Sequence, residues 1–596
     1  MNVEVTSATK TAEPLSDAAA AIYVISHDDI QRSGATSIPE ILRLAPNLEV
    51  FQLSPSNYVV TARGFNGDSQ DESFSNKLLV LIDGRSVYSP LYSGVYWDAQ
   101  DVMIQDIERV EVISGPGATL WGANAVNGVI NIITRRTADT QGALVSLAEG
   151  NLERDASARF GAQSGSDLTY RVYAKGFERD SLDASTGASA DDGWSKTQGG
   201  FRADWSPGAD ALSVQGDVYR ANEHQPAGAD VSIEGTNVLG RWRHTFDAYS
   251  AVEVQAYYDQ TQRFTSGSAG IVLNTYDIEL QDSFRLGSRH DIVWGAGERV
   301  NSYDITNTAS LLFLPEHRAL NLSDVFAQDN VALTRTLKLI LGLKLENDPW
   351  SGTTPLPNAR LSWKLTDKVL LWSAVSRAIR SATPFEHDVA EYLGNTLFLA
   401  GNPDFRPEKL TAYELGFRGE AASSLSISVS TYYNVYDDLR TIDINPVTVI
   451  PLQWGNGMQG DTYGAEIWGR YQVSEAWRLA FGYDEQRQQL RFKSVLSSLL
   501  GFSQAGDDPP RQASLRSSWN LGDALTFEAD LRYVGSLPDP SVPAYGELNA
   551  RLAWRVSRHF DVALAGFNLL HAHHVEYVSP TDEIGRSVLV TADLKL

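Results

Sequence analysis

The chain has 596 residues, which is long enough for several ordinary domains or for one very large barrel. Its formal net charge of −25 argues against nucleic-acid binding, which needs basic patches. It contains no cysteine, which excludes disulfides, thiolate metal sites and cysteine nucleophiles.

The hydropathy of the chain excludes a membrane-spanning helix, because no run of about 18 apolar residues occurs. Transmembrane β-strands stay possible, since their alternating residues average out in hydropathy. Met1 is followed by polar residues rather than by a signal peptide, so we expect the sequence to start at a mature end. Residues 1–20 are small and polar, and we expect them to be mobile.

Residues 22 to about 136 predict a small α+β domain. Ser26 can cap a helix that Gly34 ends, and Ser37 with Glu40 has the form of a capping box that starts a second helix. Glycines at 115, 117, 122 and 128 then separate two β-type runs, so this last segment folds back on itself tightly. We expect strands at 22–25, 59–62, 78–82, 110–113 and 129–133.

Alternating segments of about 10–14 residues follow one another from residue 140 to the end. Apolar and polar residues alternate in 337–345, 425–435 and 525–533, which places the two sets on opposite faces of a sheet. A β-sandwich would give the same pattern. The connections favour a transmembrane barrel, because short turns alternate with long loops and because about 22 segments are present. The short turns are 164–167, 206–210, 286–289, 366–368, 521–523 and 556–558, and the long loops are 179–195, 222–234, 304–320, 382–407, 439–458, 489–509 and 569–583.

Six motifs together resemble the family of TonB-dependent outer-membrane transporters. They are VEVT (3–6), AIYVISHDDIQRSGATSIPEILRLAPNLEV (21–50), TARGF (61–65), LLVLIDGRSVY (78–88), IERVEVISGPGATLWGANAVNGVINIITRR (107–136) and FNLLHAHHVEY (567–577). The resemblance implies a membrane all-β fold: a 22-stranded antiparallel transmembrane β-barrel with an N-terminal α+β plug domain in its lumen. It implies a Ton box and mobile segment at 1–20, a plug at 21–138 and a barrel at 139–596.

The resemblance also implies partners. The Ton box would be Val3, Glu4, Val5 and Thr6, which would bind TonB by adding a strand to it. A monomer in the bacterial outer membrane, in contact with its lipid and lipopolysaccharide, is expected. The chain would bind no nucleic acid, act as no enzyme and require no cofactor, although its ligand can carry Fe(III).

A charge cluster between plug and barrel is a further implication. Arg63 would pair with Glu414 or Glu466 on the lumen face, where a carboxylate beside an arginine keeps its charge at low cost. The family usually has a second arginine where this chain has Ser114, and Arg109 is the residue that could replace it.

The expected ligand site lies at the outward tips of the plug, where aromatic rings with polar tips suit planar or catecholate ligands. Alternatively, several of these rings pack the plug against the wall. The candidate residues are Phe65, Asn66, Phe74, Tyr88, Tyr92, Tyr96 and Trp97.

Histidines at 571, 573 and 574 are candidate metal ligands, because imidazole suits zinc, copper, nickel or iron. Exposed loop histidines are more often only polar, and a metal site needs further ligands. Carboxylates in the long loops would disfavour a strongly anionic ligand unless lumen arginines offset them.

These features predict TonB-dependent active transport of a ferric siderophore or another metal chelate. Cobalamin, haem or another scarce nutrient is the alternative ligand. A passive porin is disfavoured by the plug motifs, and an enzyme barrel by the lack of a G-x-S-x-G motif. A signalling transporter would need a further domain before the Ton box.

Overall fold

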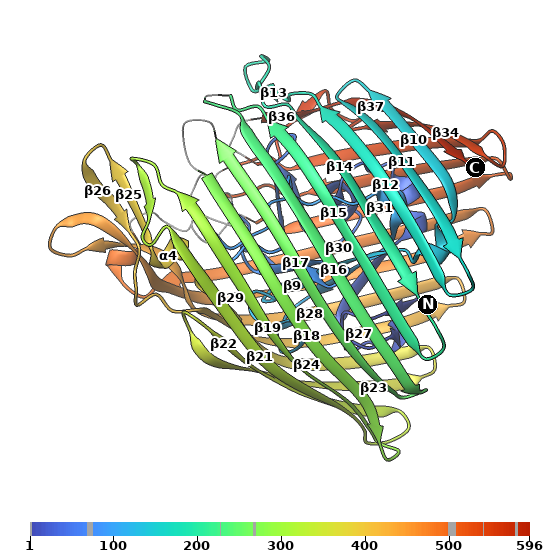
Figure 1. The fold of residues 1–596 in the computed structure, drawn as a ribbon, viewed down its shortest axis with the longest axis horizontal. Helices are drawn as coiled ribbons and strands as arrows, with labels where there is room; N and C mark the ends of the chain where they lie inside the picture. Colours follow the sequence, from blue (N-terminus) through green and yellow to red (C-terminus); the bar gives the residue numbers. More distant parts are fainter. Residues whose placement is uncertain are drawn as a thin grey trace.

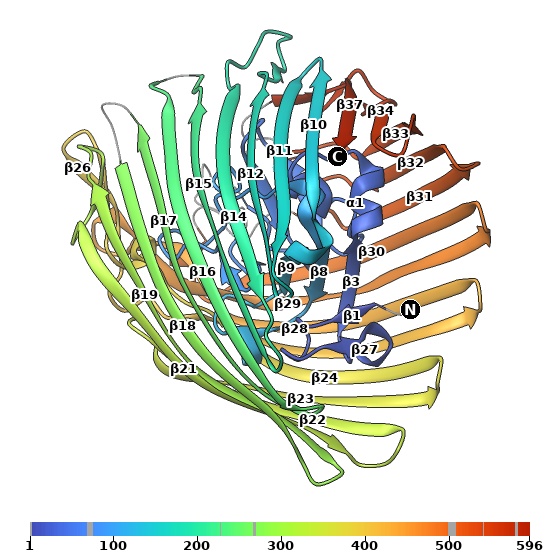
Figure 2. The ribbon, with the colours of Figure 1, turned by 45° about the vertical axis from the view of Figure 1, so that its right-hand side comes forward.

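The computed structural model describes residues 3–67, 75–226, 228–265, 270–498, 508–539, 541–577 and 582–596. Within them, 22 long strands close into one antiparallel barrel around a small N-terminal domain, the plug (Figures 1 and 2). The predicted fold class is therefore confirmed. None of the described helices is long and apolar enough to cross a membrane.

The barrel closes where the first strand of the wall pairs with the last, as Leu144 faces Lys595 and Gly150 faces Leu589. The strands of the wall are β10 (Gly142–Gly150), β11 (Glu153–Ser164), β12 (Leu168–Arg179), β14 (Trp194–Trp205), β15 (Asp210–Glu223), β16 (Val231–Asp247), β17 (Ser250–Thr265), β18 (Gly270–Leu286), β19 (His290–Thr306), β21 (His317–Ala332), β22 (Leu337–Asp348), β23 (Gly352–Thr366), β24 (Val369–Arg380), β27 (Glu408–Ala422), β28 (Leu425–Asn445), β29 (Val449–Ser474), β30 (Trp477–Phe492), β31 (Arg511–Leu521), β32 (Leu525–Val534), β33 (Tyr545–Arg555), β34 (Phe560–Phe567) and β37 (Ser587–Lys595).

The two faces of the wall differ in polarity. In β22, Leu341, Leu343 and Leu345 are exposed on the outer face, whereas Lys344 and Glu346 are buried in the lumen. Successive side chains of a strand point to opposite faces, so one sequence serves both environments. The outer face is thus apolar and the lumen polar, as a transmembrane barrel requires.

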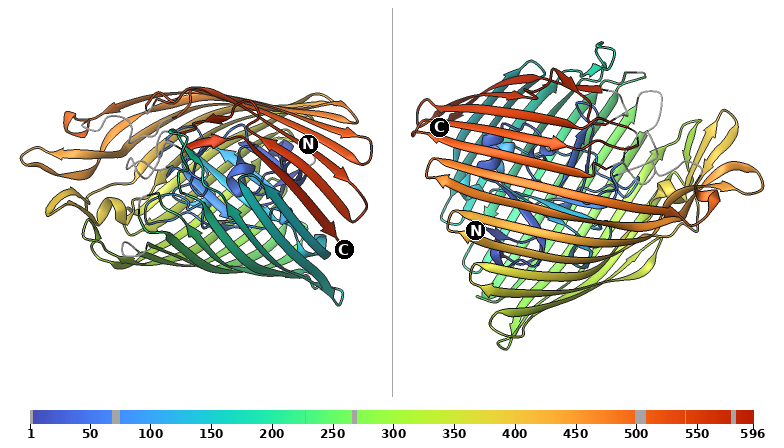
Figure 3. Two further views of the ribbon diagram at one scale, coloured as in Figure 1. Left: turned by 90° about the horizontal axis from the view of Figure 1, so that it is seen from above. Right: turned by 180° about the vertical axis from the view of Figure 1, so that it is seen from behind.

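The two ends of the barrel also differ. Turns of two to four residues join the strands at one end, for example 165–167 between β11 and β12. Both chain termini lie at this short-turn end, away from the loops that carry β25 and β26 (Figure 3). The long-loop end holds β13 (Asp183–Ala184), β20 (Leu311–Phe313), α4 (Pro384–His387), β25 (Val389–Leu393), β26 (Thr396–Ala400), η5 (Val495–Ser497), β35 (His573–His574) and β36 (Asp582–Gly585).

One predicted loop is wrong. Residues 439–458 were expected to be a loop, but β28 and β29 continue through most of this range as a hairpin with register shifts. Ile442 and Trp454 are buried there against the loop elements. The hairpin packs against apolar residues of the loops beyond the barrel wall. The strands β28 and β29 therefore continue past the end of the barrel.

The plug is built around a five-stranded sheet in the order β3-β8-β9-β6-β7. Ser26 caps α1 in a capping box with Asp29, and Gly34 ends it in the left-handed conformation. The elements of the plug are β3 (Ala21–Ser26), α1 (His27–Ser33), α2 (Ile38–Leu42), β4 (Glu49–Gln52), β5 (Tyr58–Thr61), β6 (Leu78–Ile82), β7 (Arg85–Ser86), η3 (Ile104–Asp106), β8 (Ile107–Ser114), α3 (Ala118–Trp121), β9 (Gly128–Thr134) and η4 (Thr137–Asp139).

Residues 3–20, which we expect from the sequence to be mobile, are docked against the plug in this structure. Strand β1 (Glu4–Val5) pairs with β2 (Glu13–Pro14), and η1 (Leu15–Asp17) follows. Val5 is fully buried in an apolar cluster with the plug sheet. The small and polar residues of this segment do not predict its docking, because the contacts that hold it come from plug residues far away in the sequence.

Candidate functional site

The turn after β5 carries the most strained backbone in the plug. Arg63, Gly64 and Phe65 all have positive φ, at 56°, 91° and 63°. The carboxylate of Asp508, at the end of a long loop, accepts hydrogen bonds from the backbone N–H groups of Phe65 and Asn66, both at 2.8 Å. A barrel loop therefore holds a plug conformation that non-glycine residues adopt rarely.

The structure brings Arg63 together with both predicted glutamates. Arg63 Nη1 donates to Glu414 Oε1 at 2.7 Å, while Nε and Nη2 donate to the two oxygens of Glu466 at 2.9 and 3.1 Å. Its guanidinium also lies 4.2 Å from the centre of the Tyr432 ring. All four side chains are buried, and the three partners lie on neighbouring strands of the wall. We call this group the Arg63 cluster.

Arg109 does not join the Arg63 cluster. Its Nε donates to Glu111 Oε1 at 2.8 Å, on the face of the plug that carries the N-terminal segment. Ser114 is buried and accepts a hydrogen bond from Asn47 Nδ2 at 2.7 Å. Arg63 is thus the cation that serves both glutamates here.

A second ionic cluster ties the plug to the barrel and was not predicted. Lys77 Nζ donates to Glu408 at 2.7 Å, and Arg380 bridges Glu408 and Glu386 at 2.8 and 2.9 Å. Burial lowers the pKa of Lys77 to about 8, although Glu408 opposes that shift. Lys77 lies in the plug, Arg380 and Glu408 lie in the wall, and Glu386 lies in a long loop. Only the folded chain brings these side chains together.

A third cluster joins the last long loop to the plug. Arg43 donates to both oxygens of Glu576 at 3.0 and 2.8 Å, and Arg532 donates to Glu576 at 3.0 Å. Burial alone would raise the pKa of Glu576, but the two guanidiniums outweigh it and hold that pKa well below its usual range.

The three candidate metal ligands do not converge. The His574 ring is buried, 3.2 Å from Glu576 and stacked near Tyr545, whereas His573 points toward Asp183 at 3.6 Å. The rings of His571 and His574 are 6.4 Å apart.

Glu547, His574 and Glu576 do place one ligand atom each within 4.8 Å of one another. Arg532 and Arg43 already neutralise these carboxylates, so a cation would have to displace two guanidiniums. His574 therefore supports Glu576 in the third cluster.

A cavity of about 600 Å³ opens at the long-loop end, between the plug and the loops. We call it the outward cavity. Its aromatic wall includes Tyr92, Tyr96 and Trp97 from the plug. The rings of Tyr92 and Tyr96 are 4.6 Å apart, and Trp97 is buried. His224 also reaches this cavity.

Other candidate ligand residues lie elsewhere. Phe65 and Asn66 are buried, and Phe65 packs against Tyr436 with 4.6 Å between ring centres. Tyr88 donates to the backbone oxygen of Asn76 at 3.0 Å and does not line the outward cavity. Phe74 lies outside the described residues. The plug tip therefore divides into a part that packs on the wall and a part that faces the cavity.

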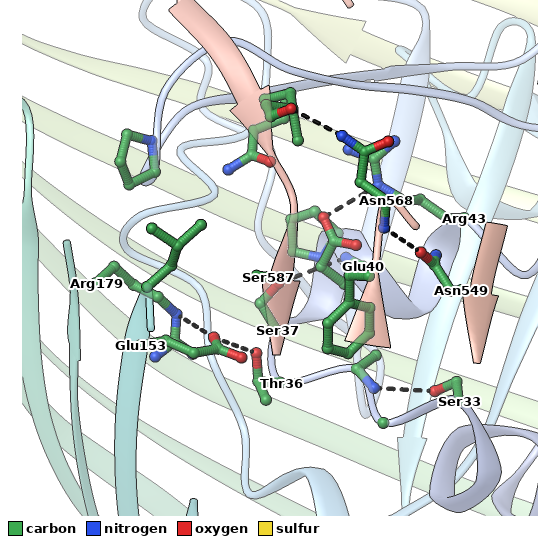
Figure 4. A pocket seen from close by; sticks show the side chains of 18 of the residues that line it. Ser33, Thr36, Ser37, Glu40, Arg43, Glu153, Arg179, Asn549, Asn568 and Ser587 are labelled. Carbon is green, nitrogen blue, oxygen red and sulfur yellow. Dashed lines mark hydrogen bonds and ion pairs between the residues drawn. The ribbon is translucent and has the colours of Figure 1, made fainter. Parts of the chain in front are cut away.

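A cavity of about 180 Å³ lies between α2 and the wall (Figure 4). Thr36 donates to Glu153 at 2.9 Å across it, and Arg179 pairs with the same carboxylate at 2.9 Å. Tyr58 and Trp97 line both this cavity and the outward one, so the two cavities share a wall there.

The N-terminal segment is held at the other side of the plug. Glu111 accepts from the backbone N–H of Thr6 at 3.0 Å and of Ser7 at 2.8 Å. Trp121 Nε1 donates to the backbone oxygen of Ser7 at 2.9 Å. Val3 packs at the edge of the same apolar cluster as Val5, so the proposed Ton box is folded away.

Two family models match the plug and the barrel separately. The model described as TonB-dependent Receptor Plug Domain matches residues 14–129. The model described as TonB dependent receptor-like, beta-barrel matches residues 147–569, which is more than half of the chain.

Individual relatives have low sequence identity to this chain, but their matches cover most of its length. The vitamin B12 transporter BtuB of Vibrio vulnificus is 27% identical over 462 residues, covering 73% of this chain and 70% of the relative. An iron-regulated outer membrane virulence protein of Vibrio cholerae is 24% identical over 96% of this chain and 92% of its own length. Among solved structures, the ferric enterobactin receptor of Pseudomonas aeruginosa superposes with a TM-score of 0.79 at 15% identity, covering 97% and 98% of the two chains.

Proposed function

The chain belongs to the family of TonB-dependent receptors, and from this premise we propose that its outward cavity binds a metal chelate for active transport across the bacterial outer membrane. Members of this family are outer-membrane receptors and transporters rather than enzymes. The ligand enters from the long-loop end, and energy reaches the barrel through TonB at the short-turn end.

The observation that carries this proposal is the separation of two sites by an anchored plug. The outward cavity lies on one side, and the N-terminal segment lies on the other. The Arg63 cluster fixes the plug to the wall between them. A passive porin needs an open lumen. Passage of a ligand through this barrel requires a conformational change of the plug. An energised partner supplies the energy for that change.

We assign TonB binding to Val3, Glu4, Val5 and Thr6. Glu4 and Val5 already pair as a short strand with β2, so their backbone is extended and suited to strand addition. Release from Glu111 and from the apolar cluster precedes that pairing. The ligand binds the outward cavity more tightly when the segment is released than when it is docked. This difference in affinity favours the released state.

A metal chelate of siderophore type fits the outward cavity best among the ligand classes considered. Tyr92, Tyr96 and Trp97 offer ring faces for a chelating group, and a cavity of about 600 Å³ suits a compact organic ligand. Cobalamin is the alternative, supported by the similarity to a vitamin B12 transporter.

Uptake of labelled chelates tests the proposal in cells that lack other receptors of this family. We expect uptake in cells with TonB and none in cells without it. Deletion of residues 3–6 is expected to abolish uptake while leaving ligand binding by purified protein intact. Uptake that is unchanged by the deletion, or by loss of TonB, would overturn the proposed mechanism.

A further inference from the structure

The plug is fastened to the wall directly after its N-terminal segment. Residues 15–20 include η1 and lead into β3, which is an edge strand of the plug sheet. They lie against β23, β24 and β27, which are three neighbouring strands of the wall. We call residues 15–20 the strap. The strap separates the proposed Ton box from the plug sheet.

Basic side chains of the wall bind the strap, mainly through its backbone. Arg418, on β27, donates to three carbonyl oxygens at 2.6, 2.8 and 2.9 Å, those of Leu15, Ala18 and Ala20. Arg360, on β23, donates to the carbonyl oxygen of Ala19 at 3.1 Å. Lys364, also on β23, pairs with Asp17 at 2.6 Å. Four carbonyl groups of the strap therefore accept from a charged donor.

The two arginines depend on the strap in turn. They take backbone carbonyls as acceptors, whereas Arg63 and Arg380 take carboxylates. Arg418 is only 2% exposed, and beyond the three carbonyls it donates to Ser428 Oγ at 3.3 Å. A buried charge is costly unless it is hydrogen-bonded. Moving the strap away would strip the Arg418 guanidinium of its main acceptors.

Small side chains let the backbone of the strap reach the arginines. Its residues 18–20 are three buried alanines, and each adds only a methyl group. Ala19 packs in an apolar core that also contains Leu370 and Trp372 of β24. The strap therefore combines apolar packing with charged hydrogen bonds, and both hold it to the wall.

The residues before the strap are held differently. Strand β1 pairs with β2 inside the segment itself. The segment reaches the wall at Lys10, which pairs with Glu279 at 2.5 Å and whose carbonyl oxygen accepts from Gln281 at 3.1 Å. Other contacts are with the plug, at Glu111 and in the apolar cluster. Tension at residue 3 therefore meets these contacts first, and then the strap, where several charged donors act together.

The plug sheet begins immediately after the strap. Strand β3 pairs on one side with β8, from Ala21 opposite Ser114 to Ser26 opposite Arg109. An edge strand has a single neighbour in its sheet. Tension that reached Ala21 would pull β3 away from β8 starting at its first pair. The strap lies at the position that protects this pair.

We propose that the strap is a mechanical stop. Arg418 and Arg360 pass tension from the N-terminal segment into the barrel wall, so residues 3–14 are drawn out while β3 stays paired with β8. This inference rests on the proposed function, because TonB is the partner that applies the tension. It deepens that function by assigning how much of the chain TonB displaces before the plug sheet itself must yield.

Force spectroscopy on the complete receptor in a lipid bilayer tests the stop without TonB. Val3→Cys introduces the only cysteine of the chain, and a handle attached to it carries the load. Drawing out residues 3–14 is expected to lengthen the chain by at most about 40 Å, at about 3.5 Å for each residue. A separate force peak then marks the strap. A first event that already releases β3 would overturn the inference.

Substitution of the two arginines tests their role in the stop. Arg418→Gln with Arg360→Gln is expected to lower the strap peak or merge it with the release of β3, because the charged donors are lost. Arg470→Gln is the matched control, since this wall arginine donates to the carbonyl oxygen of Val24 at 3.1 Å, beyond the strap. It is expected to leave the strap peak unchanged. An unchanged peak in the double variant, or an equal loss in the control, would contradict the assignment.

Cysteine labelling gives a second measurement that needs no load. Ala20→Cys places a thiol at a buried strap position, and it is expected to resist maleimide even when Glu111→Ala loosens the N-terminal segment. Addition of Arg418→Gln is expected to speed its labelling by about tenfold or more. Rapid labelling of Ala20→Cys with Glu111→Ala alone would overturn the inference.

A thiol in the plug sheet separates release of the strap from loss of the whole plug. Ile130→Cys, at a fully buried position of β9, is expected to stay unreactive in every one of these variants. Labelling there together with Ala20→Cys would show that Arg418→Gln unseats the entire plug, and would contradict a local role for the strap.

The inference and the proposed function fail in different experiments. The handle takes the place of TonB, so an absent strap peak overturns the stop and leaves TonB-dependent uptake as expected. Uptake that does not depend on TonB would overturn the proposed function and leave the force peak in place.

Discussion

Arg63 illustrates how a single buried side chain can hold two domains together. Its guanidinium satisfies two glutamates on different strands of the wall, Glu414 and Glu466, and all three side chains are excluded from water. The pairing itself stabilises little relative to an apolar contact, but removal of one partner leaves buried charge behind. The arrangement therefore resists any partial disruption.

Arg63→Ala is expected to destabilise the seated plug by about 3–5 kcal/mol, because both glutamates would be left without a cation. Calorimetry of the purified protein in detergent measures the change. Arg154→Ala is the control, since Arg154 forms an exposed ion pair with Glu149 on the wall, and its loss is expected to leave the transition unchanged. Similar transitions for the two variants would contradict the role assigned to Arg63.

Glu49 makes the stability of the plug depend on pH. Burial, with the nearby Asp508 and Asp484, raises the pKa of Glu49 well above its ordinary value. Gln486 donates to its Oε1 at 2.7 Å. Above the pKa of an unfolded glutamate, about 4.3, the folded protein keeps a proton that the unfolded chain has released. Its unfolding free energy therefore falls as the pH rises from that value.

Gln at position 49 has no titratable proton, so the decline in unfolding free energy above about pH 4.3 is expected to be shallower in Glu49→Gln than in the parent protein. Denaturant unfolding at a series of pH values gives both slopes, and groups common to the two proteins cancel in the comparison. Glu108→Gln, at an exposed plug position, should keep the parent slope. Identical slopes for Glu49→Gln and the parent would refute the assignment.

Some residues of the site were predictable because their sequence context is local. Arg63 lies in TARGF and Glu414 lies in AYELGF, and each short motif is enough to locate its charged residue. Lys77, Arg380 and Glu386 form an equally buried cluster but have no comparable motif. Lys77 lies 331 residues from its partner Glu408, so three-dimensional assembly is the information that the sequence lacks.

At the level of elements, the N-terminal segment is docked on the plug without joining its sheet. Glu111 accepts from two backbone N–H groups, and Val5 enters the apolar cluster of the plug sheet. Within the described residues, β1 pairs with β2 rather than with a strand of the plug sheet. The segment can therefore change state while the sheet beneath it stays folded.

The absence of native cysteine makes this opening measurable. A cysteine at position 5, introduced as Val5→Cys, should react slowly with maleimide while the segment is docked. Addition of Glu111→Ala is expected to speed labelling by about tenfold or more, since two hydrogen bonds to a charged acceptor are lost. Glu108→Ala, on the exposed part of the same strand, should leave the rate unchanged; a similar acceleration there would contradict the docking role of Glu111.

Period-two alternation and turn residues made most of the elements predictable. The strand at 78–82 and the short turns of the wall lie where their sequence places them. The hairpin of β28 and β29 and the docked N-terminal segment were missed for a common reason. Each is stabilised by burial against distant elements, and such packing overrides local composition.

For the whole molecule, charge is the property that acts at a distance. The chain carries a net charge of −25, and the outward cavity concentrates part of its acid groups at the entrance. Fields of this kind steer oppositely charged ligands, and salt screens them over about 8 Å at physiological ionic strength.

The folded-away N-terminal segment has a consequence for the cell that expresses many such receptors. On the proposed assignment of TonB binding to residues 3–6, a receptor whose segment is docked does not compete for TonB, so the partner remains available to receptors that have captured a ligand. The share of TonB that each receptor type occupies follows from the free energy of undocking rather than from its copy number alone. Glu111 and Val5 contribute to the free energy of undocking here. They therefore also affect how often this receptor engages TonB when other receptors compete for it.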